Sequence, residues 1–111
     1  MNKILIVEKC FEMCKMWKCY FEGVFEVVIA KSIDEASQML KKHQNVVVIA
    51  LGDVPITNVS ALGFVKSFKG LVVAMSPHRQ INEQLALFYG CKRCNPWELV
   101  TMLDKRCLKC S

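Results

Sequence analysis

The sequence has no long hydrophobic run and no export signal. No apolar stretch in its 111 residues reaches the ~18–20 residues that are needed to cross a membrane. The apolar start KILIV is followed at once by Glu8 and Lys9, which argues against a signal peptide. We therefore expect a cytoplasmic protein that does not span a membrane.

Motifs of several enzyme classes are also missing. The sequence contains neither a G-x-G-x-x-G motif nor a P-loop, so the usual nucleotide-binding signatures are absent. Ser76, His43 and His78 lack triad spacing, no G-x-S-x-G turn is present, and we expect both histidines to be exposed loop residues. No linker, repeat or low-complexity segment divides the chain. Residues 1–111 are therefore expected to form a single domain that is not an enzyme.

The basic residues are scattered rather than clustered, although the net charge is +5. The densest group, Lys105, Arg106 and Lys109, lies at the C-terminal end of a predicted helix, where cations interact favourably with the helix dipole. No groove-reading motif accompanies these residues. We do not expect this domain alone to bind nucleic acid.

The chain has seven cysteines, an odd number in a sequence without an export signal. This combination argues against a disulfide framework. The alternatives are reduced thiols in the core, metal ligands and redox-active thiols.

Apolar runs of strand length alternate with segments whose apolar residues recur at helical spacing. Strands are expected at residues 3–7, 25–30, 45–51, 71–75 and, short and polar, 91–94, and helices at residues 11–21, 33–42, 59–68, 80–89 and 97–109. Ser32 and Glu35 have the spacing of a capping box. Near-continuous apolar strands in this order predict an α/β fold with a parallel sheet covered on both faces. Sites in such folds lie at the carboxyl ends of the strands.

Several segments, in this order, resemble the receiver domain of bacterial response regulators. They are KILIVEK, FEVVIAKSIDEASQML, VVVIAL, LVVAMS and NPWELVTML, which together extend over nearly the whole chain. The resemblance implies a CheY-like (flavodoxin-like) three-layer sandwich with a doubly wound, five-stranded parallel sheet. We expect the fifth strand to be short or irregular.

The resemblance also implies where phosphorylation chemistry would lie. Receivers hold Mg²⁺ with an acidic pair after the first strand and phosphorylate an aspartate that ends the third. A Ser or Thr ends the fourth strand, and a Lys precedes a Pro after the fifth. The matching positions here are Glu8, Lys9, Ala50 (or Leu51 if the strand is shifted by one), Ser76 and Asn95.

The acceptor, one carboxylate of the metal site and the lysine are therefore replaced together. We interpret the chain as a degenerate receiver that has lost aspartyl phosphorylation and needs no cofactor. We further hypothesise that the Lys9 ammonium takes the position of Mg²⁺ and balances the charge of Glu8.

Asp53 is the alternative phosphoacceptor. It lies beyond Gly52 and would overshoot the end of the strand by up to ~10 Å unless the loop folds back. A Gly-Asp pair shortly before Pro55 is also ordinary turn chemistry, which is the simpler interpretation.

Two cysteine patterns suggest a metal site. Cys91 and Cys94 form one C-x-x-C pair, and Cys107 and Cys110 form another, which is a zinc signature. The helix expected between the pairs would be roughly 20 Å long, so one ion cannot bind both pairs unless that helix breaks. Cys107 and Cys110 also continue an apolar stripe, which favours core positions for them.

The predicted fold brings a different set of thiols together near the carboxyl edge of the sheet, namely Cys10, Cys14, Cys91 and Cys94. They could bind Zn²⁺ or an iron–sulfur cluster, form a reversible disulfide, or remain unlinked thiols. Helix N-termini and the neighbouring Lys9, Lys92 and Arg93 are expected to lower the pKa values of these thiols.

Aromatic residues flank the expected fifth strand. Phe88, Tyr89 and Trp97 are either core residues or a partner-binding face, because receivers signal through this side of the fold. Our interpretation is a phosphorylation-independent signalling module that binds protein partners or a second copy of itself. The alternatives are a thiol or metal sensor on the same scaffold and a receiver phosphorylated at Asp53.

Overall fold

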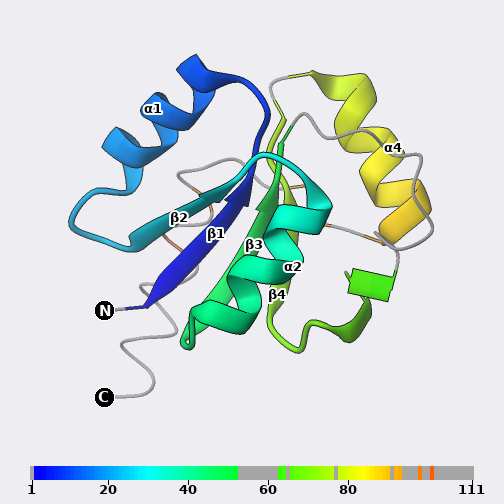
Figure 1. Ribbon diagram of the computed structural model, residues 1–111. Coiled ribbons are helices and arrows are strands. Elements are labelled where there is room, and N and C mark those ends of the chain that lie inside the picture. Colours follow the sequence, from blue (N-terminus) through cyan, green and yellow to red (C-terminus); the bar gives the residue numbers. More distant parts are fainter. Residues whose placement is uncertain are drawn as a thin grey trace.

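A computed structural model describes residues 2–52, 63–64, 66–76, 78–90, 92–93, 98 and 101. Four strands form a parallel sheet in the order β2-β1-β3-β4 (Figure 1). They are β1 (Lys3–Val7), β2 (Glu26–Ala30), β3 (Val46–Leu51) and β4 (Leu71–Ala74). A two-residue strand, β5 (Lys92–Arg93), pairs in parallel with the outer side of β4. The predicted α/β class and parallel sheet are confirmed.

Helices α1 (Phe11–Phe21), α2 (Ile33–Lys42) and α4 (Arg79–Tyr89) follow β1, β2 and β4 in the chain. Figure 1 shows α2 in front of the sheet, with α1 (blue) and α4 (yellow) on opposite sides of the view. Residues 63–64 and 66–67 are helical, as are Glu98 and Thr101. The remainder of the helices expected at 59–68 and 97–109 lies outside the described residues. Among the described residues, none of the helices has the length and apolar character of a transmembrane span.

Side chains of the strands alternate between two apolar cores. One core packs Ile4, Ile6 and Ala50 against Trp17 and Phe21 of α1. The core on the other face is lined from the sheet by Leu5, Val7, Ile49 and Leu51, and from the helices by Ala36, Phe64 and Leu85. The sheet is therefore covered on both faces, as its near-continuous apolar strands predict.

Local polar contacts explain where the elements begin. The Ser32 hydroxyl accepts a hydrogen bond from the Glu35 backbone N–H (3.1 Å), which confirms the predicted N-cap of α2. The Glu35 carboxylate accepts from the N–H of Lys31 (3.2 Å), one residue earlier than in a standard capping box. Strand β3 begins at Val46 rather than Asn45, because Asn45 has a φ of 70°, outside the extended region.

His43 differs from its prediction as an exposed residue. It is half-buried at the end of α2, and its Nδ1 lies 3.2 Å from the Nζ of Lys3. The reason is that β1 begins beside the end of α2, so the two side chains meet at the amino edge of the sheet. His78 is exposed, as predicted.

Candidate functional site

The strands remain hydrogen-bonded beyond their carboxyl ends. The N–H of Glu8 donates to the carbonyl of Ala30, and the N–H of Gly52 donates to that of Val7, both at 2.9 Å. The N–H of Met75 donates to the carbonyl of Leu51 at 2.9 Å, which places Ser76 directly after this contact. Glu8, Gly52 and Ser76 therefore lie at one edge of the sheet, where a site is expected.

Glu8 is enclosed at this edge. Its side chain is 0% exposed, and its Oε2 accepts a hydrogen bond of 2.9 Å from the backbone N–H of Lys9. A Cβ atom at position 52 would lie 2.9 Å from the carboxyl carbon and Oε1 of Glu8 and 3.0 Å from Oε2. Only glycine therefore allows this carboxylate to lie against the backbone after β3.

Gly52 is a site residue that was named above only as the first residue of a Gly-Asp turn. The signal available was a glycine placed directly after a buried strand, where glycine often marks a close approach of backbone to another group. The sequence does not show which group approaches, because Glu8 and Gly52 are 44 positions apart in the chain.

Strand β3 ends at Leu51. Of the two residues considered for the acceptor position, Leu51 rather than Ala50 is therefore the last residue of the strand. Ala50 and Leu51 are both 0% exposed and belong to the cores on opposite faces of the sheet. Neither residue carries a side-chain oxygen. Asp53 and Asn95 lie outside the described residues.

The described residues at this edge do not fit Mg²⁺. A hard dication needs several oxygen ligands. Glu8 supplies one enclosed carboxylate, Leu51 supplies no side-chain oxygen, and Lys9 carries a positive charge. Lys9 is exposed, and the hypothesis that its ammonium replaces the metal stays a prediction.

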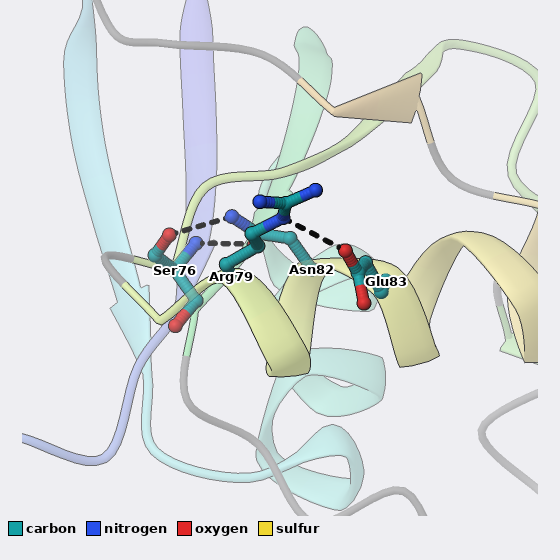
Figure 2. Close-up of polar contacts among 4 residues, drawn as sticks. All are labelled: Ser76, Arg79, Asn82 and Glu83. Atoms are coloured by element: carbon teal, nitrogen blue, oxygen red, sulfur yellow. Dashed lines mark hydrogen bonds and ion pairs between the residues drawn. The ribbon is translucent and has the colours of Figure 1, made fainter.

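Ser76 is held by residues that follow it in the chain (Figure 2). Its backbone N–H donates to the Oδ1 of Asn82 (2.8 Å), and the Nδ2 of Asn82 donates to the Ser76 carbonyl (2.7 Å). Its hydroxyl accepts from the backbone N–H of His78 (3.1 Å). Asn82 is a second residue that the sequence analysis missed, since only the folded connection shows its contact with Ser76.

The predicted thiol cluster is described for one pair only. Cys10 is exposed, whereas Cys14 is buried and its Sγ donates to the Glu8 carbonyl (3.5 Å). Cys91 and Cys94 lie outside the described residues. Within the described ranges, no group of three or more His, Cys, Asp or Glu side chains is placed to hold a metal ion.

The prediction of lowered thiol pKa values is wrong for Cys14. Burial raises the pKa of the Cys14 thiol above its usual value, and the charges of Glu8 and Cys10 act in the same direction. Lys31 and Lys18 oppose this shift and do not reverse it. The cause is that the thiol lies on the inward face of α1, where desolvation disfavours its ionised form.

The outer face of α4 carries an exposed apolar residue beside charged ones. Leu87 is 79% exposed, and Arg79, Glu83, Ala86 and Leu87 line a shallow, open depression of the surface. Arg79 and Glu83 form an exposed ion pair of 2.9 Å (Figure 2). Of the predicted interaction face, the side chains of Phe88 and Tyr89 and all of Trp97 lie outside the described residues.

Comparison with known proteins identifies the fold. No protein-family model and no curated protein matches the sequence. The chemotaxis protein CheY4 of Vibrio cholerae matches the structure with a TM-score of 0.68 and 19% identity, covering 95% of this chain and 98% of that one. The signal receiver domain of an HD domain-containing protein from Pseudomonas fluorescens Pf-5 has a TM-score of 0.71, 12% identity and coverages of 94% and 92%.

A third match comes from the co-crystal structure of the Saccharomyces cerevisiae histidine phosphotransfer signaling protein Ypd1 and the receiver domain of its downstream response regulator Ssk1. Its TM-score is 0.63 at 18% identity, and it covers 83% of this chain and 75% of that one. At such identities the likeness shows the fold. The chain therefore has the CheY-like fold of response-regulator receiver domains.

Proposed function

We propose that this chain is a receiver-type signalling domain that binds protein partners without being phosphorylated on aspartate. One observation carries the proposal. The strand that should end in the acceptor ends instead in Leu51, which is fully buried among apolar side chains. A phosphoryl acceptor needs an accessible nucleophilic oxygen, and leucine offers none.

The surroundings of Leu51 support the same proposal. The enclosed Glu8 carboxylate and the exposed Lys9 make a poor Mg²⁺ site, because Mg²⁺ needs several oxygen ligands and Lys9 supplies none. The fold itself is that of receiver domains, which supports a signalling role. Since Ypd1 and the receiver domain of Ssk1 were crystallised together, a protein is a reasonable class of partner for this chain as well.

The face that we propose for the partner is the outer side of α4. Leu87 and Ala86 supply apolar surface there, and the Arg79–Glu83 ion pair supplies charges of both signs. A second copy of the chain is one candidate for the partner.

The test is a phosphodonor experiment on the intact chain. We expect the amide NMR spectrum to remain unchanged when beryllofluoride or acetyl phosphate is added with millimolar Mg²⁺, because Leu51 cannot take part. An active receiver domain treated in the same way serves as the positive control. Shifts at the strand ends would contradict the proposal, and their loss in the variant Asp53→Asn would identify Asp53 as the acceptor.

The thiol or metal sensor is less well supported than the signalling role. Cys14 is buried and its raised pKa reduces its thiolate fraction, whereas a sensor thiol needs exposure and thiolate character. Metal analysis with a free-thiol count on protein purified without oxygen separates the two functions. Seven free thiols without bound metal are expected, and bound zinc or iron would favour the sensor.

A further inference from the structure

Helix α4 begins without the side-chain hydrogen bond that usually caps a helix. The N-cap residue of α4 is His78, whose side chain makes no capping hydrogen bond, and the first turn of α4 contains no acidic residue. Helix N-termini usually depend on such groups, because their first N–H groups have no partner within the helix. The beginning of α4 is tied to the sheet by a contact from inside the helix.

Asn82 supplies that contact. It lies in the first turn of α4, and its side-chain amide makes two reciprocal hydrogen bonds with the backbone of Ser76, at 2.8 and 2.7 Å. A carboxamide carries one acceptor oxygen and an N–H donor group, as a peptide group does. It can therefore supply the hydrogen-bond partners that a neighbouring strand would give to the Ser76 backbone. Ser76 itself is 6% exposed and follows Met75, whose N–H still bonds to β3.

Ser76 lies between the sheet and α4, so its contact with Asn82 connects the two. On one side Ser76 continues β4, which is hydrogen-bonded into the sheet. On the other side its hydroxyl accepts from the N–H of His78, which shapes the turn into α4. The Ser76–Asn82 pair therefore joins the end of the sheet directly to the first turn of the helix (Figure 2).

We propose that Asn82 is the positioning residue of α4. Its amide holds the β4–α4 connection in one arrangement in the free protein, so the outer face formed by Arg79, Glu83, Ala86 and Leu87 is oriented without covalent modification. This inference rests on the proposed function in assigning the α4 face to a partner. The hydrogen-bonded pair can be tested on its own.

The test compares Asn82→Ala with Gln84→Ala by amide hydrogen exchange of the full chain. Both changes remove a side-chain amide from α4, but Gln84 is exposed. In Asn82→Ala, exchange at the Ser76 N–H should accelerate on the order of ten-fold beyond any change at amides of β1, because ten-fold corresponds to about 1.4 kcal/mol, which is in the range of one hydrogen bond. New line broadening should appear in residues 76 to 83. Gln84→Ala should show neither effect.

A second variant keeps the inference testable if Asn82→Ala does not fold. Asn82→Asp retains the acceptor for the Ser76 N–H but loses the donor to the Ser76 carbonyl. It should keep the protection of the Ser76 amide while broadening the resonances of the β4–α4 connection. Two results would overturn the inference. One is a hydrogen-exchange rate at the Ser76 amide that changes only by the factor seen for amides of β1. The other is that the resonances of the β4–α4 connection stay sharp in both Asn82 variants.

The experiment also separates this inference from the proposed function. Exchange is measured without phosphodonor or partner, so its outcome does not depend on whether the chain can be phosphorylated. Phosphorylation at Asp53 would end the proposed function and would not alter the exchange result for the unmodified protein. If Asn82→Ala does not change exchange at Ser76, the inference fails, but Leu51 still offers no acceptor oxygen and the proposed function is not affected.

Discussion

Cys14 carries a thiol whose ionisation is controlled by its position on α1. The side chain is 7% exposed and donates to the Glu8 carbonyl, so deprotonation would place a charge in an apolar region beside a carboxylate. Cys10 and Cys19, in contrast, are exposed. Two residues of the same type, four positions apart at Cys10 and Cys14, therefore differ in chemistry because only one faces the core.

We predict that iodoacetamide at pH 8 modifies Cys10 and Cys19 well before Cys14. The reason is that alkylation requires an accessible thiolate, and burial both covers Cys14 and raises the pKa of its thiol. Timed alkylation followed by peptide mass spectrometry measures the order. Equal rates in the folded protein would contradict it, and equal rates in urea provide the control for intrinsic reactivity.

The same shift has a consequence for stability. The pKa of the Cys14 thiol is raised in the folded state. The stability that the protonated Cys14 thiol contributes to the folded protein is therefore fully present below the ordinary pKa of 9.0 and is lost as the pH rises through the folded-state pKa. Unfolding at increasingly alkaline pH should therefore become easier, and Cys14→Ala should reduce this pH dependence more than Cys19→Ala does.

At the scale of the elements, the junction of β1 and β3 depends on Gly52. The N–H of Gly52 bonds to Val7, while its missing side chain leaves room for the Glu8 carboxylate. The residue after β3 is thus a glycine that leaves space for the side chain of Glu8, the residue after β1. The two strands are neighbours in the sheet, although α1, β2 and α2 separate them in the chain.

We predict that Gly52→Ala lowers the free energy of unfolding by about 1–3 kcal/mol, because the new methyl group overlaps the buried carboxylate. Chemical denaturation measures the change. Gly63→Ala is the matched control, since Gly63 is helical and a Cβ there meets no atom within 4 Å. That change should be neutral or stabilising by ~0.5–1 kcal/mol. Unchanged stability in Gly52→Ala would mean that Glu8 is not confined as described.

Most elements could be predicted from the sequence because their signals are local. The bounds of β1 and α1 agree with the apolar runs and helical spacing at 3–7 and 11–21. Strand β2 begins one residue later than predicted, because the N–H of Phe25 bonds to the Phe21 carbonyl and completes the turn after α1. Such shifts depend on single hydrogen bonds that residue type does not reveal.

At the scale of the whole molecule, the sheet separates two apolar cores that depend on the same strands. Leu85 of α4 is 0% exposed and belongs to the core that also contains Leu51 and Val7. Leu87, two positions later, is 79% exposed. The helix therefore uses one leucine for the stability of the fold and presents the other on the surface.

We predict that Leu85→Ala lowers the free energy of unfolding by about 2–5 kcal/mol, whereas Leu87→Ala changes it by less than about 0.5 kcal/mol. The first substitution leaves a cavity in the shared core, and the second removes an exposed side chain from the same helix. Unfolding followed by circular dichroism compares the two. Equal effects would show that α4 does not pack through Leu85.

The sequence by itself determined the alternation of strands and helices and the presence of Ala50 and Leu51, rather than an aspartate, at the third strand's end. These features follow from apolar periodicity, capping residues and residue identity, which act over a few neighbouring positions. The tertiary structure alone decided that Leu51 ends the strand, that Glu8 lies against Gly52 and that Asn82 holds Ser76. The physical reason is that these contacts depend on the register and folding back of segments, which local spacing does not specify.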